Sequence, residues 1–327
     1  MIGSTIKGLG TALPEKILTN QDLERMVDTS DEWITTRTGI KERRITDSET
    51  ASSDLAAQAA EKAIAESGID KKDIDMIIVG TVTPDTLFPS TACVVQAKLG
   101  LPNIPAFDIL AACPGWLYAL TIADSFIKSG KCRNVIAIGV ETLTKITNWE
   151  DRNTCVLFGD GAGAAVLSKA EEGDGLLHSS FISANGSLGH LLVQPAGGSR
   201  MPASKETVEK NLHTVHMAGS EVFKNAVKFM ANASKMAIKE AGLTPEDIDW
   251  VIPHQANIRI IESLAKKLRK PMDRVIVTIE KYGNTSSSTI PIALREAIDD
   301  GRIKRGDKLL FVSFGGGFTW GAVVITY

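Results

Sequence analysis

Apolar and polar positions along the chain follow two periods in turn, and this alternation predicts an α/β fold. Strand-like patterns cover residues 3–13, 76–82 and 134–140, and residues 158–167 are predicted to be a glycine-rich approach to a further strand. Apolar positions at helical spacing cover residues 20–27, with Asn20 as a candidate cap, and residues 53–67, which Gly68 ends. Residues 30–40 are predicted to be irregular and polar around one tryptophan.

The second half of the chain repeats the first. One constant offset relates three pairs of residues: Gly68 and Gly242, Asp73 and Asp247, Asp75 and Asp249. The same offset aligns the apolar run 134–139 with 308–313 and Cys113 with Ser287. Two copies of one α/β unit would let equivalent loops meet at a shared site. We expect halves at residues 1–172 and 173–327; the alternative is that unrelated helix–turn–strand units look alike.

A cysteine stands where the apolar run 107–112 meets a helical pattern at residues 117–127. Pro114 suits the first helical position and disfavours helical backbone at the preceding residue, which puts Cys113 just outside the helix. A thiol there faces unpaired backbone N–H groups and the positive end of the helix dipole, which predicts a lowered pKa. A small buried hydrophobic side chain is the alternative for a lone cysteine.

Three loops of the second half carry candidate chemistry. His254 follows an apolar run, at an end where parallel strands of α/β sheets place ligands. Asn284 lies in a polar turn before the helix predicted at residues 288–299, and three glycines follow another run at residues 315–317. Each feature taken alone has an alternative: a structural role for His254, an ordinary loop around Asn284, and a tight turn at residues 315–317.

These parts together suit acyl-thioester chemistry, because they supply a nucleophile and donors for oxyanion and enolate charge. A Cys-His-Asn peptidase uses the same residue types in the same order, but this chain lacks the local signature of the papain-like cysteine. A cysteine hydrolase, a non-condensing acyltransferase and a non-enzymatic scaffold remain alternatives.

Composition narrows the class of protein further. The 327 residues carry a net charge of -3, which argues against a general nucleic-acid binder. The four cysteines are far apart, with no C-x-x-C pair, so neither a metal site nor a disulfide is expected. No run is long enough to cross a membrane, and residues 1–5 lack a signal-peptide pattern, which predicts a cytoplasmic protein.

At this point the chain resembles the β-ketoacyl-acyl-carrier-protein synthase III family of the thiolase superfamily, nearly end to end. The resemblance is carried by these segments: Asp31-Glu32-Trp33, Arg37-Thr38-Gly39-Ile40, Ala111-Ala112-Cys113, Phe158-Gly159-Asp160-Gly161-Ala162-Gly163, Pro253-His254-Gln255-Ala256-Asn257, Gly283-Asn284-Thr285-Ser286 and Phe314-Gly315-Gly316-Gly317-Phe318-Thr319-Trp320-Gly321. Asn284 in the third place of the triad favours the Cys-His-Asn branch over elongating synthases, which use a second histidine.

The resemblance implies a thiolase-like duplicated α/β fold, layered α-β-α-β-α, and a decarboxylative Claisen condensation that initiates fatty-acid synthesis. Cys113 would take an acyl group from acetyl-CoA or another short acyl-CoA, with the amides of Cys113 and Gly316 as the oxyanion hole. His254 and Asn284 would then stabilise the enolate that forms when malonyl-acyl-carrier protein loses CO2. No cofactor is implied, since the CoA thioester is a substrate, and a homodimer is expected.

The resemblance also implies roles around the nucleophile. Trp33 and Arg152 would sandwich the adenine of CoA, Arg37 would meet its phosphates and Asn257 its pantetheine arm. Phe88 would form the floor of the acyl pocket of a partner subunit. Core packing is the alternative for both Trp33 and Phe88. The chain departs from the family pattern after the cysteine, where Trp116 would reshape the acyl pocket or the packing beneath it.

A basic docking surface is expected for an acidic carrier protein. Lysines of the helix predicted at residues 221–241 share one stripe, and a second basic group follows at residues 259–270. Solvated faces are the alternative for such charges. The residues assigned to docking are Lys224, Gln255, Ala256, Asn257, Ile258, Arg259, Lys266 and Lys267.

Overall fold

The computed structural model describes residues 3–327 and contains two large sheets whose strands follow the same order. The first sheet has the order β1 (Ser4–Ala12), β7 (Asp160–Lys169), β6 (Asn134–Thr142), β4 (Met76–Gly80) and β5 (Ala106–Ile109). The second has the order β8 (Leu176–Ala184), β13 (Thr319–Thr326), β12 (Lys308–Gly315) and β11 (Trp250–Pro253).

Strand directions match between the two sheets as well. The pairs β1–β7 and β8–β13 are antiparallel, as are β6–β7 and β12–β13. The pairs β4–β6 and β11–β12 are both parallel. Corresponding strands thus have the same neighbours and the same directions, which confirms the predicted thiolase-like duplicated fold. Strand β5 forms an edge of the first sheet, and a single parallel bridge between Val251 and Val275 takes the equivalent place beside β11 in the second.

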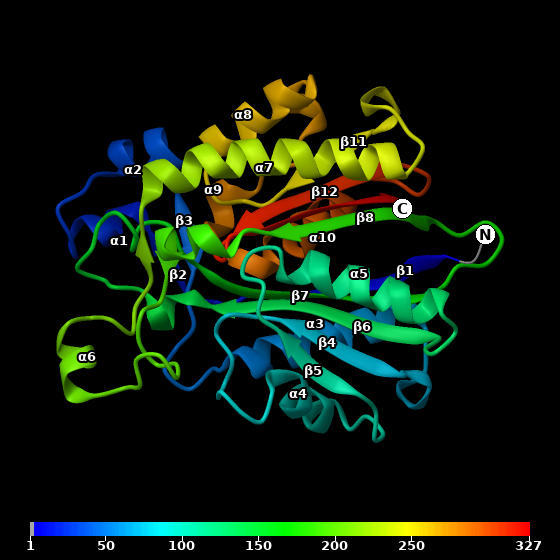
Figure 1. Cartoon of the computed structure of the whole chain (residues 1–327), viewed down its shortest axis with the longest axis horizontal. Helices are drawn as coiled ribbons and strands as arrows, with labels where there is room; N and C mark the ends of the chain where they lie inside the picture. Colours follow the sequence, from blue (N-terminus) through cyan, green and yellow to red (C-terminus); the bar gives the residue numbers. More distant parts are fainter. Residues whose placement is uncertain (1–2) are drawn as a thin grey trace.

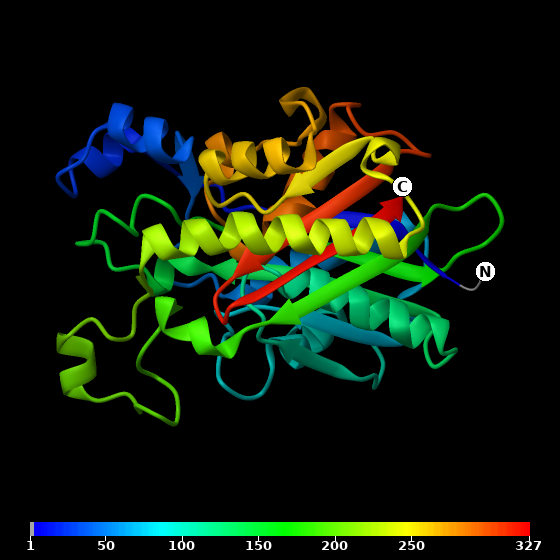
Figure 2. The same cartoon turned by 45° about the horizontal axis from the view of Figure 1, so that its top comes forward.

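Helices separate and cover the sheets in five layers (Figure 1). Helices α5 (Gly115–Lys128) and α10 (Thr289–Asp299) lie between the sheets, and their apolar residues join both sheets in one core. The outer face of the first sheet packs against α3 (Ser52–Ser67) and α4 (Thr91–Leu99). The outer face of the second packs against α7 (Gly219–Glu240) and α8 (Ile258–Leu268), which Figure 2 shows in front.

Shorter elements gather at one end of the layers (Figure 1). They are β2 (Ile17–Thr19), β3 (Glu42–Arg44), β9 (Leu192–Val193), β10 (His216–Met217), α1 (Asn20–Glu24), α2 (Asp31–Thr38), α6 (Lys205–Glu209) and α9 (Ile279–Tyr282). Two predictions for this region are wrong. Thr19 caps α1, whereas Asn20 is buried and donates to the Ile40 carbonyl at 2.8 Å.

The second wrong prediction concerns residues 30–40, which contain helix α2 with its two caps rather than an irregular segment. The helix has few apolar positions, so its periodicity is weak. Its ends nevertheless carry the expected signals: Ser30 accepts a hydrogen bond from the Trp33 amide, and Gly39 takes the left-handed conformation at φ 82°. Capping residues were therefore the better signal here than hydrophobic pattern.

The long strands and helices agree with the sequence-based prediction to within about two residues at most ends, as expected for boundaries drawn from periodicity. Met1 and Ile2, which the N-terminal interpretation included, lie outside the described residues. Within residues 3–327, none of the helices has the length and apolarity that crossing a bilayer requires.

Candidate active site

One cavity of about 840 Å³ brings together side chains from both halves of the chain. Cys113, His254 and Asn284 all line it, although they come from three separate loops. Trp33, Arg37 and Asn257 line the same cavity. The duplicated fold therefore assembles the predicted nucleophile, imidazole and carboxamide in one place.

The backbone around Cys113 is tightly constrained. The chain leaves β5 and turns through Ala112, which has a positive φ of 50°, before α5 begins at Gly115. Helix α5 thus starts one residue later than predicted, and Cys113 lies outside it as expected. On the opposite side, a Cβ added to Gly315 would lie 2.7 Å from the Cys113 nitrogen. The first glycine of the 315–317 loop is thus needed for this close approach.

Burial, rather than the helix end, dominates the pKa of the Cys113 thiol. Burial raises the pKa of this thiol to about 12, and the negative charge of Glu141 adds to the rise. Hydrogen bonding by Ser286 and by the Cys113 amide lowers the pKa by a smaller amount. The sequence-based prediction of a lowered pKa is therefore wrong, because removal of the thiolate from water outweighs the helix end. Acylation consequently needs a proton acceptor.

His254 follows the end of β11, is buried, and faces this cavity through its ring. Burial lowers the pKa of His254 to about 3, so the ring is neutral at physiological pH. Its Nδ1 lies 2.7 Å from the Thr289 hydroxyl, which also lies 3.0 Å from the Ser286 carbonyl. That hydroxyl has one hydrogen, so its orientation decides which ring nitrogen carries the proton.

The carboxamide of Asn284 has a fixed orientation. The Ser286 amide donates to Asn284 Oδ1 at 2.9 Å, which fixes the oxygen in a local turn and leaves Nδ2 as the group available to a ligand. The Asn284 backbone pairs with the 157–159 segment of the first half, through Leu157 and Gly159. Both halves therefore position this side chain.

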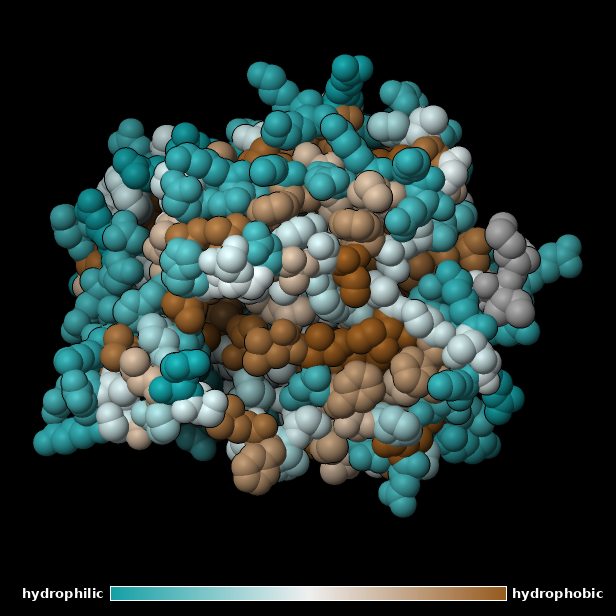
Figure 3. All heavy atoms as spheres, in the orientation of Figure 1, coloured by the Kyte–Doolittle hydropathy of each residue, from teal (hydrophilic) through white to brown (hydrophobic). Residues whose placement is uncertain are grey.

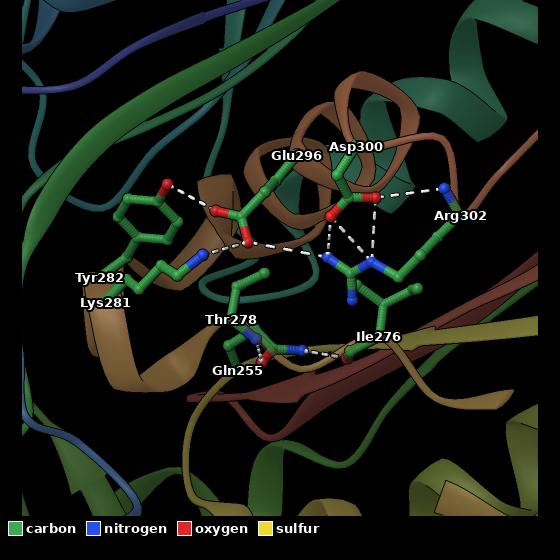
Figure 4. Close-up of polar contacts among 8 residues, drawn as sticks. All are labelled: Gln255, Ile276, Thr278, Lys281, Tyr282, Glu296, Asp300 and Arg302. Carbon is green, nitrogen blue, oxygen red and sulfur yellow. Dashed lines mark hydrogen bonds and ion pairs between the residues drawn. The ribbon is translucent and has the colours of Figure 1, made fainter. Parts of the chain in front are cut away.

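Gln255 connects the histidine and asparagine segments (Figure 4). Its Nε2 donates to the Ile276 carbonyl at 3.1 Å, and its Oε1 accepts from the Thr278 amide at 2.9 Å. The side chain is only 1% exposed. The predicted role of Gln255 in carrier docking is therefore wrong, because the residue is buried and its amide is already paired.

Figure 4 also shows a polar cluster around Glu296, which contacts the residues just before Asn284. Glu296 of α10 accepts from the Tyr282 hydroxyl at 2.6 Å and pairs with Lys281 at 2.9 Å and Arg302 at 3.7 Å. Tyr282 lies two residues before Asn284. The ion pairs are at the surface and contribute little to stability, so their main effect is to connect α9 to α10.

Three of the residues predicted to bind CoA line the cavity, namely Trp33, Arg37 and Asn257, and the fourth, Arg152, contacts Trp33. The guanidinium groups of Arg37 and Arg152 stack on Trp33, at 4.7 Å and 5.1 Å from the ring centroid respectively. Arg152 also donates to the Asp28 carbonyl at 2.7 Å. Asn257 caps α8 and donates to the Arg37 carbonyl at 2.9 Å, so part of its predicted binding capacity is already used.

Two aromatic residues were assigned to the acyl pocket, Trp116 and Phe88. Trp116 is buried in the central core, where its Nε1 donates to the Ala137 carbonyl and its ring packs on Phe311 at a centroid distance of 5.6 Å. Its assignment to the acyl pocket is wrong, and the alternative of packing beneath the site holds. Phe88 is 86% exposed, which excludes core packing within one chain.

The predicted docking residues divide between two places. Lys224 and Arg259 line the cavity, as does Ala256. Lys224, Lys266 and Lys267 line a neighbouring groove between α7 and α8. Ile258 instead packs against the Gly39 backbone, where an added Cβ would be 2.8 Å from its side chain.

Sequence analysis missed three polar residues that contact the site. Glu141, at the end of β6, directly follows the apolar run 134–140 and received no role, while Ser286 was placed in a polar turn and Thr289 in the helix predicted at residues 288–299. An acid that interrupts the end of a buried strand was the available signal, because ionised groups are rarely buried without partners.

The comparisons with known proteins agree with this geometry. The sequence pattern described as 3-Oxoacyl-[acyl-carrier-protein (ACP)] synthase III matches residues 107–186, and that of its C-terminal part matches residues 238–327. The β-ketoacyl-[acyl-carrier-protein] synthase III of Caldanaerobacter subterraneus subsp. tengcongensis is 59% identical over 326 residues, covering 100% of this chain and 98% of that protein. The corresponding protein of Symbiobacterium thermophilum is 54% identical over 323 residues, covering 98% and 97%.

Among solved structures, the 3-oxoacyl-[acyl-carrier-protein] synthase III from Aquifex aeolicus VF5 superimposes with a TM-score of 0.91. It is 51% identical, and the match covers 99% of this chain and 100% of that one. The duplicated fold and its shared cavity define a condensing enzyme of the thiolase type. With these identities, the chain belongs to the β-ketoacyl-acyl-carrier-protein synthase III family, the acyltransferases that initiate fatty-acid synthesis.

Proposed function

We propose that the chain condenses a short acyl-CoA, with acetyl-CoA as the expected starter, with malonyl-acyl-carrier protein. The single observation that carries this proposal is the cavity shared by Cys113, His254 and Asn284. Cys113 attacks the thioester, releases CoA and holds the acyl group. The CoA thioester is a substrate, and the reaction uses no cofactor.

The second half-reaction builds the new carbon–carbon bond. Nδ2 of Asn284 and Nε2–H of His254 donate to the thioester oxygen of the malonyl group, which becomes an enolate as CO2 leaves. The enolate carbon attacks the acyl-Cys113 carbonyl, whose oxygen is held by the amides of Cys113 and Gly316. The product is a β-ketoacyl-carrier protein. The neutral His254 and the oriented carboxamide of Asn284 support these roles.

Binding of CoA requires the outer cavity to rearrange. Arg152 stacks directly on Trp33, so adenine enters between them only when this cation–π pair opens. Arg37 is then available for phosphate oxygens, for which a guanidinium fork is well suited.

A homodimer is proposed from the exposed apolar surface around β5. This strand is an edge of its sheet, and Leu87, Phe88 and Leu110 nearby are each more than 80% exposed. Figure 3 also shows an apolar band across the face seen in Figure 1. Paired β5 edges would cover such surface, and Phe88 would then reach the acyl pocket of the partner subunit.

Mass spectrometry separates this function from its alternatives. The protein is first incubated with acetyl-CoA and then with malonyl-acyl-carrier protein. We expect a gain of one acetyl group, followed by its loss and the appearance of acetoacetyl-carrier protein. Release of free acetate would indicate a hydrolase instead. Transfer of intact acetyl to the carrier, without loss of CO2, would indicate a non-decarboxylating acyltransferase.

The carrier-docking proposal predicts a selective effect of charge. In Lys266→Ala/Lys267→Ala, association with malonyl-carrier protein should slow about tenfold at low salt, because electrostatic steering is lost. Acylation by acetyl-CoA should change little. Stopped-flow kinetics at several ionic strengths measure both steps. Lys239→Ala, an exposed lysine towards the other end of α7, is the matched control. Equal slowing in the control and the double variant would contradict the assignment.

A further inference from the structure

A buried arginine lies between the two segments that carry Trp33 and Arg152. Arg43, the middle residue of β3, has no exposed surface. Its Nη2 donates to the Val156 carbonyl at 2.7 Å, and its Nη1 donates to Asn20 Oδ1 at 3.0 Å. Nη1 also lies 3.1 Å from a backbone carbonyl of β2. Within residues 3–327 these acceptors are two carbonyls and a carboxamide rather than a carboxylate. A buried cation without an anion is costly, so its presence here suggests a specific task.

Asn20 extends this contact to helix α2. Because its Oδ1 accepts from Arg43, its Nδ2 can donate, and it does so at both ends of the helix. One bond goes to Asp31 Oδ1 in the first turn and the other to the Ile40 carbonyl just beyond the C-cap, each at 2.8 Å. A single carboxamide therefore fixes both ends of the helix that carries two of the residues predicted to bind CoA.

The Val156 carbonyl belongs to the segment that carries Arg152. Residues 152–157 form successive turns, and the Cys155 amide donates to the Asp151 carbonyl at 2.9 Å. The segment is thus compact, and a bond to its Val156 carbonyl also fixes the backbone of Arg152. A continuous line of hydrogen bonds runs from this segment through Arg43 and Asn20 to α2.

The shape of the guanidinium explains why an arginine occupies this position. Apolar residues of the same region, such as Ile34 and Ile40, pack the segments together, but apolar contact does not fix direction. A planar guanidinium donates along fixed directions to several acceptors at once, whereas a lysine ammonium acts as a single point charge. The stem of Arg43 is also closely packed, since a Cβ added to Gly159 would lie 3.1 Å from its Cβ.

We propose that Arg43 is a positioning residue that aligns α2 with residues 151–157, and thereby aligns Trp33 and Arg152 on the two faces of the CoA adenine. The inference rests on the proposed function, in which CoA delivers the acyl group. Arg43 is not among the residues that line the cavity, so it acts through the segments it joins. When the side chain of Arg152 moves aside to admit adenine, the backbone spacing set by Arg43 is kept.

Two acetyl donors test the proposal. Acetyl-CoA and S-acetyl-pantetheine share the thioester and the pantetheine arm, but the second lacks the nucleotide. In Arg43→Lys, the concentration of acetyl-CoA that half-saturates acylation should rise about tenfold, the scale of one weakened stacking contact on a base. The limiting rate, and acylation by S-acetyl-pantetheine, should change little, because the Ser286 amide fixes the Asn284 carboxamide locally. Intact-mass measurement of acyl-enzyme formation at several donor concentrations gives these values.

Asn20→Asp tests the second link of the line. Aspartate still accepts from Arg43, but it cannot donate to the Ile40 carbonyl, so α2 should loosen and the same selective loss should follow. This variant also carries the test if Arg43→Lys does not fold. In a Trp33→Ala background, Arg43→Lys should cause no further loss with acetyl-CoA, because one face of the adenine site is already missing.

Arg295→Met is the matched control. Arg295 of α10 pairs with Glu66 of α3 at 2.9 Å, and it is not among the residues that line the cavity. Its loss should lower the unfolding temperature without changing the half-saturating concentration of either donor. Equal losses with both donors in Arg43→Lys, or an undiminished loss in the Trp33→Ala background, would show a general structural role and overturn the proposal.

The wild type separates this proposal from the function on which it rests. If the wild type used both donors equally well, there would be no nucleotide site for Arg43 to align, and the proposal would fail while acylation of Cys113 stood. If neither donor acylated the wild type, the proposed function itself would be rejected. We expect the wild type to acylate with both donors and to half-saturate at a lower concentration of acetyl-CoA.

Discussion

Replacing Cys113 with alanine is expected to abolish covalent acylation and to lower the condensation rate by a factor on the order of 10⁶, as in other enzymes that lose a covalent nucleophile. The reason is that the sulfur alone holds the acyl group while the carrier substrate replaces CoA. Intact-mass measurement after incubation with acetyl-CoA should show no gain of an acetyl group. Binding of CoA should persist, because Trp33 and Arg37, which also line the cavity, are unchanged in this variant.

Cys93→Ala is the matched control for this variant. Cys93 is exposed, whereas Cys113 is only partly accessible, so a simple reactivity argument would favour Cys93 as the labelled residue. The control should acylate like the wild type. Labelling that persists in Cys113→Ala and disappears in Cys93→Ala would contradict the assignment of the nucleophile.

The fold followed from the sequence because duplication leaves a record in paired residues. Gly68 and Gly242 both end helices or turns in left-handed backbone, and Asp75 and Asp249 both accept amides at the starts of equivalent strands. These positions are set by local backbone chemistry, which the sequence expresses directly. Helix α2 escaped prediction because its stability comes from capping and tertiary contact rather than from a hydrophobic stripe.

The site was predictable in its residues but not in its electrostatics. A helix start suggested a lowered pKa for Cys113, yet burial and Glu141 raise it. Burial depends on what the second half places over the thiol, above all Gly315, and no local pattern reports that contact. The predictions for Gln255 and Trp116 are wrong for the same reason. Glutamine and tryptophan are common at binding surfaces, but here both side chains are buried and donate hydrogen bonds to backbone carbonyls.

Loss of either hydrogen-bond donor should selectively impair decarboxylation. In His254→Ala and Asn284→Ala we expect the decarboxylation of malonyl-carrier protein to fall about 10² to 10³-fold, the usual effect of removing one oxyanion donor. Both donors act on one oxygen in a buried cavity, where the low dielectric strengthens each bond. Acylation should fall far less, because it precedes enolate formation. Release of labelled CO2 measures the first step and intact-mass labelling the second.

Asn284→Asp distinguishes hydrogen bonding from shape. Aspartate matches asparagine in size but offers a carboxylate where the enolate charge develops, so its decarboxylation rate should lie below that of the alanine variant. A rate near wild type would show that Asn284 only fills space.

The wild-type decarboxylation rate should show no inflection from His254 between pH 5 and 8, because burial lowers the pKa of His254 to about 3 and the ring is neutral throughout. An inflection in that range that vanished in His254→Ala would mean that the imidazolium, rather than the neutral ring, stabilises the enolate.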